Sequence, residues 1–267
     1  MKGVLDMRIK RLQFFQSVLW SLLVCTLFAG SALAVASDSD FVELCKNGTL
    51  QQINDAIKDG ANVNASDDKG RTPLISAAAR DEPCPEIITA LIKAGADVNA
   101  RTGDGSTALM WAASDSSPEV VKILIKADAI VNAQNADGLS PLMCAAEYNS
   151  DPVVITTLIE SGADIHMRNI DGITPLMFAA AKNPNTEVII VLIKAGADIN
   201  VENKEKWTPL MLAAWKTSNP EVITTLLNHG ADAKVRDIYG RRALDYAWGN
   251  EKLANTDAFW ELNRVSY

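Results

Sequence analysis

The side chains that most often carry out chemistry in proteins are scarce in this 267-residue sequence. They are two histidines and four cysteines, namely His166, His229, Cys25, Cys45, Cys84 and Cys144. A zinc site needs several such ligands at short spacing, and neither histidine belongs to a cluster with that spacing. No Gly-rich phosphate loop, no Gly-x-Ser-x-Gly motif and no cysteine paired with an assignable histidine is present. The sequence therefore predicts a protein that is not an enzyme and that binds no metal and no cofactor.

The cysteines do not indicate a disulfide framework. Cys45, Cys84 and Cys144 are the three that follow residue 36, and they form an odd and sparse set. Small exported domains that depend on disulfides carry many cysteines in even number. We therefore expect these thiols to be structural.

The first 36 residues have the layout of a secretory signal. Four basic residues precede an uncharged run over residues 14–36, namely Lys2, Arg8, Lys10 and Arg11. The run ends at Ala32-Leu33-Ala34, which fits an A-x-A cleavage site. We predict a signal peptide at residues 1–36, cut after Ala34 or Ala36. The alternative is an uncleaved membrane anchor, because the run is long enough to cross a bilayer.

Both alternatives place the remainder of the chain outside the cytoplasm, since a positive flank stays on the cytoplasmic side. We expect an exported protein, first of all in a bacterial periplasm. Secretion and anchoring in the inner membrane are the alternatives. Cleavage would leave no membrane segment.

The charge of the remaining chain excludes one class of partner. Residues 1–36 hold four basic residues and one acidic residue, Asp6, so the formal charge of the chain changes from −8 to −11 without them. A domain this acidic repels phosphate backbones. We therefore predict that it does not bind nucleic acid.

One phrase recurs along the chain at a nearly constant period. Its copies begin with TPLISAAA and TALMWAAS and start at Thr72, Thr107, Ser140, Thr174, Thr208 and Arg242. The starts lie 35, 33, 34, 34 and 34 residues apart. A period of this length indicates a repeat architecture in which each copy is one small structural unit.

Each part of the repeat has a structural reason. The Thr-Pro start supplies a helix N-cap followed by proline at the first helical position. The Ala pair leaves room for a close neighbouring helix. Apolar pairs four residues apart, such as Ile87-Ile88 with Leu91-Ile92, place a wide apolar stripe on a second helix. Phrases such as AGADVN from Ala94 place a glycine where that helix ends. No unit can bury its stripes alone, so the units must stack.

These phrases resemble the ankyrin-repeat family, with its TPLHxAA, LLxxGADVN and DxxGxTPL signatures. The resemblance covers essentially all of residues 38–267. It implies an all-α repeat fold: an ankyrin-repeat solenoid of about seven helix-turn-helix units with short β-hairpin-like fingers and atypical capping units. Two departures are visible, because apolar residues replace the family's histidine after TPL, and loops such as NPNTEVI from Asn183 replace its Gly-His.

The repeat also predicts the domain limits. After the signal peptide we expect one ankyrin-repeat domain over residues 37–267. Its N-terminal capping unit should span about 38–66, its internal units about 67–236 and its C-terminal capping unit about 237–267. In the last unit we expect Phe259 and Trp260 to seal the exposed end of the stack.

The resemblance implies that partners contact the concave face formed by finger tips and inner-helix ends. In the first units this face is polar, with Arg80, Asp104 and Asp115. In the later units large apolar groups occupy positions that should face water, and we predict that they bind a partner: Leu139, Tyr148, Ile170, Ile173, Trp207, Trp215 and Tyr239. The alternative for Leu139 and Ile173 is packing of finger against finger. Lys206 replaces a finger glycine, which predicts either a different turn or a strained residue.

From these patterns we expect a monomeric, non-catalytic scaffold that binds another protein outside the cytoplasm. Two alternatives stay open: a regulator that inhibits or protects an exported enzyme, and an envelope tether if the signal is not cleaved.

Overall fold

The structure is a computed structural model that describes residues 37–115 and 117–267. The chain divides into residues 1–36 and the compact unit Ser37–Tyr267. The predicted signal peptide and its cleavage site lie outside the described residues.

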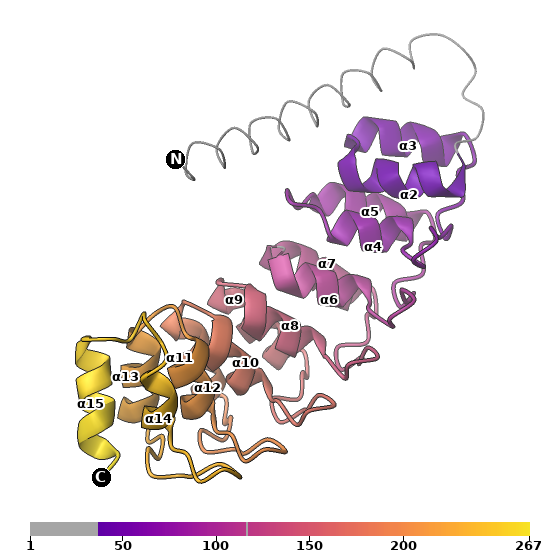
Figure 1. Ribbon diagram of the computed structural model, residues 1–267. Helices are drawn as coiled ribbons and strands as arrows, with labels where there is room; N and C mark the ends of the chain where they lie inside the picture. The colour runs from indigo at the N-terminus through magenta and orange to yellow at the C-terminus, as the bar shows by residue number, and fades with distance from the viewer. Residues whose placement is uncertain (1–36, 116) are drawn as a thin grey trace, which may run out of the picture. The chain divides into compact units, whose positions relative to one another are not determined.

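The described residues form two rows of short helices (Figure 1). The inner row consists of α2 (Asp38–Asn47), α4 (Pro73–Ala78), α6 (Ala108–Asp115), α8 (Pro141–Tyr148), α10 (Pro175–Lys182), α12 (Pro209–Lys216) and α14 (Ala243–Ala247). The outer row consists of α3 (Leu50–Lys58), α5 (Pro85–Lys93), α7 (Pro118–Lys126), α9 (Pro152–Glu160), α11 (Thr186–Lys194), α13 (Glu221–Asn228) and α15 (Asp257–Val265). Each inner helix and the outer helix that follows it form one unit, so units 1 to 7 run from α2–α3 to α14–α15. The predicted all-α solenoid of about seven helix pairs is confirmed.

The inner helices begin where the Thr-Pro signal places them. In α4, α8, α10 and α12 the hydroxyl of the Thr or Ser before the proline accepts a hydrogen bond from the third helical N–H. This bond satisfies a donor that a helix start leaves free. The same short phrase therefore starts the inner helix at the same place in these four units.

One apolar core runs through the whole stack. The alanine pairs of the inner helices and the paired Val, Ile and Leu residues of the outer helices are buried, from Phe41 in α2 to Leu262 in α15. Burying one such Leu or Ile side chain contributes about 1.5–3 kcal/mol. A single unit buries too few of them to fold alone, so the stability belongs to the stack.

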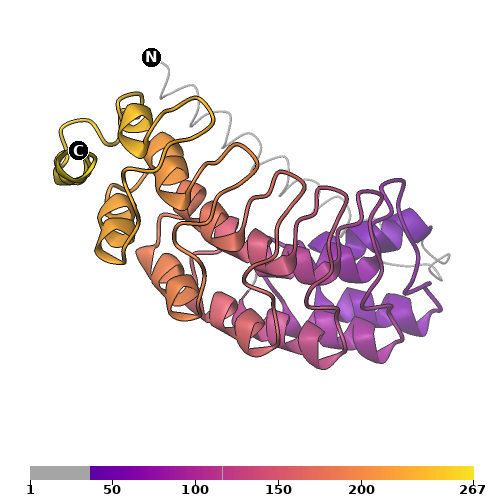
Figure 2. The ribbon, with the colours of Figure 1, turned by 90° about the horizontal axis from the view of Figure 1, so that it is seen from below.

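The fingers between units project to the same side and follow one another along the stack (Figure 2). Adjacent finger tips are joined by backbone hydrogen bonds, for example from Ala136 N to Asp104 O at 2.8 Å and from Ile170 N to Asp137 O at 3.1 Å. Among the described residues the only isolated bridge of β type joins Arg101 to Thr107, within one finger. Gly138 has a φ of 74°, and a Cβ added there would lie 2.9 Å from the Ile170 nitrogen. Glycine is needed at this tip because both its φ and the next finger leave no room for a side chain.

Lys206 occupies the equivalent tip position in unit 6. Its φ is 59°, and its N–H donates to the Asn203 carbonyl at 3.1 Å, as Gly138 N donates to Asn135 O at 2.9 Å. The turn is therefore the same, and Lys206 is a strained left-handed residue. Of the two alternatives that the sequence left open, the second is the correct one.

A second set of contacts ties each finger to the next unit through an asparagine amide. Four asparagines donate to a carbonyl of the following unit and accept from a backbone N–H there: Asn64, Asn99, Asn132 and Asn200. His166 occupies the equivalent position in unit 4. Among the described residues no hydrogen bond joins its side chain to Asp198 in unit 5, and a cavity of about 130 Å³ lies there. The joint between units 4 and 5 therefore lacks a clamp that its neighbours have.

The C-terminal end is sealed by one of the two predicted side chains. Phe259 is buried at 4% exposure, whereas Trp260 is 55% exposed. Trp248 and Trp260 both lie edge-on to Phe259, with ring centroids 4.9 and 5.3 Å away. The expectation that Trp260 seals the stack is wrong, because the single ring of Phe259 fills the space and leaves Trp260 in solvent.

In the part of the chain that the structure describes, no helix has the length and apolar character needed to cross a membrane.

Candidate protein-binding site

The inner face of the stack is the surface formed by the finger tips and the last turns of the inner helices. Four of the predicted binding residues are exposed on it, with exposed fractions of 48–65%: Tyr148, Ile170, Trp215 and Tyr239. They come from units 4 to 7. Large apolar groups at such exposure are informative because they leave contact area available to a partner.

Trp207 is a correction to the prediction. It is only 8% exposed, because its ring folds onto the next unit and lies 5.2 Å from the ring of Trp215 and 4.3 Å from that of Tyr246. Its backbone N–H donates to the Asn203 side chain at 2.8 Å. Within the described residues the Trp207 Nε1 is buried and has no acceptor. Trp207 therefore supports Trp215 from behind and does not itself offer contact area.

Leu139 and Ile173 hold the equivalent position, just before the inner helix, in units 4 and 5. Both are partly buried, and Ile173 packs against the core. For Ile173 the alternative of internal packing is the better description. Neither side chain stands out from the face as Tyr148 and Trp215 do.

Sequence reasoning missed one exposed aromatic residue on this face. Trp111 in α6 is 40% exposed and occupies the inner-helix position that Cys144, Phe178 and Leu212 fill in later units. Those three are more enclosed. The signal was present, since the phrase TALMWAAS places the largest side chain of the series at that position.

A charge pair with a buried carboxylate and a half-exposed ammonium group lies beside Tyr148. The Glu147 carboxylate, whose side chain is 5% exposed, pairs with the Lys182 ammonium of the next unit. This hydrogen bond raises the pKa of Lys182. Lys182 also lies 5.4 Å from the centroid of the Tyr148 ring. The pair thus holds a cation against the exposed aromatic residue and joins units 4 and 5.

The same combination of ring and cation recurs in the last two units. The Lys216 ammonium lies 4.1 Å from the ring centroid of Trp215. The Arg241 guanidinium lies 4.7 Å from the Tyr239 ring and 5.0 Å from the Tyr246 ring. Contacts of this kind contribute about 0.5–1 kcal/mol when exposed. They hold the rings in defined orientations.

Buried asparagine amides lie directly beneath this part of the face. Asn149 donates to Ala113 O, Asn183 to the carbonyls of Ala146 and Asn149, and Asn250 to those of Ala214 and Thr217, at 2.9–3.2 Å. We call Asn149, Asn183 and Asn250 the amide ladder. Each amide caps the end of the preceding inner helix, where carbonyl groups lack partners. Asn149 and Asn183 lie in the longer loops that replace the family's Gly-His.

The first two units are tied differently. The Arg80 guanidinium reaches back from unit 2 and donates to the carbonyls of Cys45 at 2.9 Å and Gly48 at 3.0 Å. It satisfies the end of α2 as the amides do in later units. Arg80 is therefore partly buried and engaged, and not the freely solvated group that the sequence indicated.

Two of the three cysteines in the described residues are strongly affected by burial. Burial raises the pKa of the Cys45 and Cys144 thiols to about 12, so neither is a nucleophile at neutral pH. No group of three or more His, Cys, Asp or Glu side chains within residues 37–115 and 117–267 could hold a metal ion. What this geometry offers is contact surface.

The fold and this face define a helical repeat protein with an exposed, aromatic inner surface. The family model described as ankyrin repeats (3 copies) matches residues 77–169, 142–237 and 176–256. These matches together span residues 77–256, which are 180 of the 267 residues. The chain belongs to the ankyrin-repeat family. Ankyrin repeats generally mediate protein–protein interaction and are typically non-enzymatic scaffolds.

Among solved structures the chain is similar to the human ASB11 ankyrin repeat domain. The TM-score is 0.72 at 27% sequence identity, over 83% of this chain and 96% of that domain. The comparison with curated proteins finds no match.

Proposed function

We propose that this protein is a scaffold that binds one partner protein through the inner face of units 4 to 7. The observation that carries the proposal is the set of exposed rings Tyr148, Trp215 and Tyr239, each of which lies against a cation. Tyr and Trp dominate the binding energy of interfaces. Rings that are already held in place lose less conformational entropy on binding, a cost of about 0.5–1.5 kcal/mol for each flexible side chain.

The test compares two double variants of equal aromatic loss. Tyr148→Ala with Trp215→Ala removes two rings of the inner face, whereas Trp260→Ala with Tyr267→Ala removes one exposed Trp ring and one exposed Tyr ring at the C-terminal end. A partner is first isolated by crosslinking with the wild-type chain, and its affinity for each purified variant is then measured by calorimetry. We expect the first variant to weaken binding by at least tenfold and the second to change it less than threefold, since two hot-spot truncations cost about 2–4 kcal/mol. Equal affinities of both variants would refute the proposed face.

We also propose that the protein acts outside the cytoplasm. The basic residues Lys2, Arg8, Lys10 and Arg11 before the uncharged run of residues 14–36 support this location. N-terminal sequencing of the protein from the producing cell is the direct test. A start at Val35 or Ser37 supports export with cleavage, a start at Met1 in a membrane fraction supports the tether, and a start at Met1 in the cytosol overturns export.

A further inference from the structure

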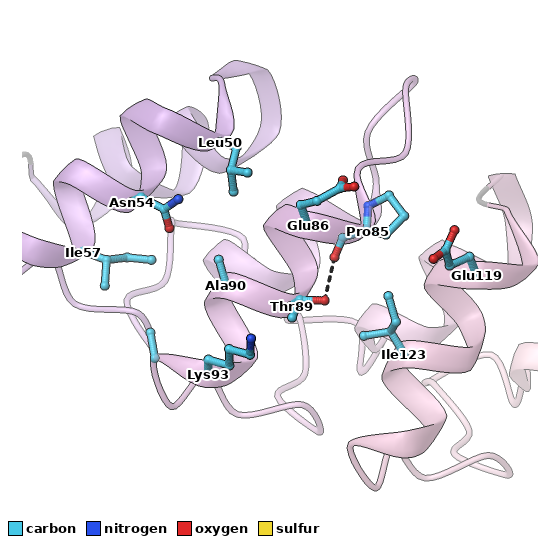
Figure 3. Close-up of a pocket in the computed structure, with 11 residues that line it drawn as sticks. Leu50, Asn54, Ile57, Pro85, Glu86, Thr89, Ala90, Lys93, Glu119 and Ile123 are labelled. Carbon is cyan, nitrogen blue, oxygen red and sulfur yellow. Dashed lines mark hydrogen bonds between the residues drawn. The ribbon is translucent and has the colours of Figure 1, made fainter.

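A groove lies on the opposite side of the stack, along the outer helices of units 1 to 3 (Figure 3). It has a volume of about 650 Å³. Helix α5 forms its floor, α3 forms one wall with Leu50 and Ile57, and α7 forms the other wall with Ile123. The groove thus follows the direction of three neighbouring helices, which is the shape that receives a further helix.

The groove exists because the floor is made of small side chains. Ala90 is the floor residue, and the outer helices of units 3 to 6 carry larger groups at the same position: Ile123, Thr157, Val191 and Thr225. The neighbouring Thr89 hydroxyl donates to the Pro85 carbonyl at 2.8 Å, so its polar atom is satisfied within α5. The floor of the groove therefore favours contact with an apolar side chain.

The two ends of the groove carry opposite charges. Glu86 and Glu119 line one end, at the first turns of α5 and α7, and Lys93 lines the other, in the last turn of α5 (Figure 3). Among the described residues no ion pair is formed by any of the three, although Glu86 accepts a contact from the Cys84 thiol at 3.3 Å. Residues 86 and 93 are two helical turns apart, a distance of about 10 Å along the axis. An occupant of matching charge needs a basic group and an acidic group about seven helical residues apart.

We propose that this groove binds an amphipathic helix of a partner protein that runs antiparallel to α5, with acidic residues in its first turn and basic residues in its last turn. In that direction the partner's basic end meets Glu86 and Glu119, and its acidic end meets Lys93. The same arrangement is favourable for the partner helix itself, because acids near the N-terminus and bases near the C-terminus complement its dipole. The antiparallel direction also sets its dipole against that of α5.

The charge of the surrounding region favours this occupant. Residues 37–165 hold nine basic and twenty acidic residues, a net charge of −11, whereas residues 166–248 hold ten basic and nine acidic residues, a net charge of +1. The groove lies in the acidic region, so the basic end of the helix is attracted to it from a distance. This surface is separate from the inner face, and either can be correct without the other.

The test uses two synthetic 15-residue peptides of identical composition. The first has two Glu in its first turn, a Leu and Ala face, and two Lys in its last turn; in the second, the Glu and Lys pairs are exchanged. Binding of fluorescein-labelled peptide to the full chain is followed by anisotropy. We expect the first peptide to bind at least tenfold more tightly than the second.

Two variants locate the binding. Ala90→Leu fills the floor and should weaken the binding of the first peptide at least tenfold. Thr225→Leu introduces the same residue at the equivalent helix position in unit 6 and should leave the affinity unchanged. Urea unfolding establishes that both variants are folded.

Three results would overturn the proposal: no binding of the first peptide, equal binding of both peptides, or binding that Ala90→Leu does not weaken. The competing occupant is a second copy of this chain, and sedimentation of the chain alone measures whether it self-associates. Self-association that the same floor variant abolishes would assign the groove to a second copy of this chain and would also overturn the proposal.

Discussion

The early units and the late units of this stack are joined by different chemistry beneath the same face. Between units 1 and 2 a single partly exposed guanidinium, that of Arg80, caps the preceding helix. Between units 3 and 4, units 4 and 5, and units 6 and 7 a buried side-chain amide caps the preceding helix, and Asn183 and Asn250 each donate to two carbonyls of the preceding unit. The exposed rings of Tyr148, Trp215 and Tyr239 lie in the amide-joined part. The exposed rings therefore lie in the part of the stack where buried polar groups fix the position of each unit relative to the next.

The largest expected effect comes from removing one amide of the ladder. Asn183→Ala deletes hydrogen bonds to Ala146 O and Asn149 O and one accepted from Asn185 N. Asn183 is 1% exposed, so the carbonyls it leaves behind lack solvent. We expect a loss of about 2–4 kcal/mol in the free energy of unfolding, measured in urea. The control Asn54→Ala removes a side chain for which no hydrogen bond is found in the described region, and should change stability by less than about 0.5 kcal/mol. Similar losses for both variants would contradict the role of the ladder.

A smaller loss of stability is expected at Arg80, whose guanidinium caps the end of α2 as the amides cap later inner helices. Arg80→Met keeps the aliphatic stem and removes three charge-assisted hydrogen bonds, two to the preceding unit and one to Glu82 O within its own unit. Because the guanidinium is partly exposed and water can replace it, we expect a loss of about 1–2 kcal/mol. Hydrogen exchange should show the extra opening in α2 and not in the later units. Exchange that rises evenly along the stack would contradict a local cap.

The third prediction concerns the joint between units 4 and 5, where His166 replaces the asparagine that clamps the neighbouring joints. His166→Asn restores the amide that ties units 1 to 2, 2 to 3, 3 to 4 and 5 to 6. Two new hydrogen bonds at a largely exposed site should raise the free energy of unfolding by about 0.5–1.5 kcal/mol. The Asp198 amide hydrogen should then exchange more slowly. The reverse change, Asn132→His, should cost a similar amount. An unchanged stability in both variants would show that the clamp is energetically neutral.

The fourth prediction concerns Asp237 in unit 7 and the pH dependence of the free energy of unfolding below neutral pH. Burial works to raise the pKa of Asp237, but hydrogen bonds from the Tyr246 hydroxyl and from the backbone N–H groups of Arg241 and Tyr239, together with the Arg241 charge, hold it below its ordinary value. A carboxyl group whose pKa is lowered by folding stabilises the protein above its unfolded pKa of about 4, and this contribution disappears as the pH falls through the lower folded value. Asparagine at the equivalent positions 135, 169 and 203 accepts the same backbone bonds.

Asp237→Asn should therefore fold, and the wild-type advantage over it at pH 7 should shrink as the pH is lowered below about 4. Urea unfolding at pH 7, 5 and 3 measures this difference. An advantage that stays constant over this range would contradict the lowered pKa.

The smallest expected effect is relief of strain in a finger. Lys206→Gly removes a left-handed lysine at the tip of unit 6, where most other fingers carry glycine. We expect a gain of about 0.5–1 kcal/mol, reduced by the greater freedom of glycine in the unfolded chain. Asp128→Gly, at a helix end with a φ of 64°, is the matched case in unit 3. Thermal unfolding that shifts downward in both variants would contradict strain at these residues.

The sequence by itself determined the repeat, and with it the fold. Thr-Pro caps, alanine pairs and helix-ending glycines act over a few residues, and they recur in phase, so they specify each unit without knowledge of its neighbours. The period also placed Tyr148, Ile170, Trp215 and Tyr239 on the inner face, because equivalent positions in a regular stack have equivalent surroundings.

Only the tertiary structure decided which of these side chains remain available. Trp207 was expected on the surface, but its ring lies against Tyr246 of the next unit, and Arg80 reaches back to the unit before it. The amide ladder was visible only as recurring asparagines at 149, 183 and 250, which gave no indication of the carbonyls they would meet. These contacts join residues about 35 positions apart, and long side chains choose among several neighbours there. Local patterns fix the backbone of each unit, whereas packing between units fixes what a side chain touches.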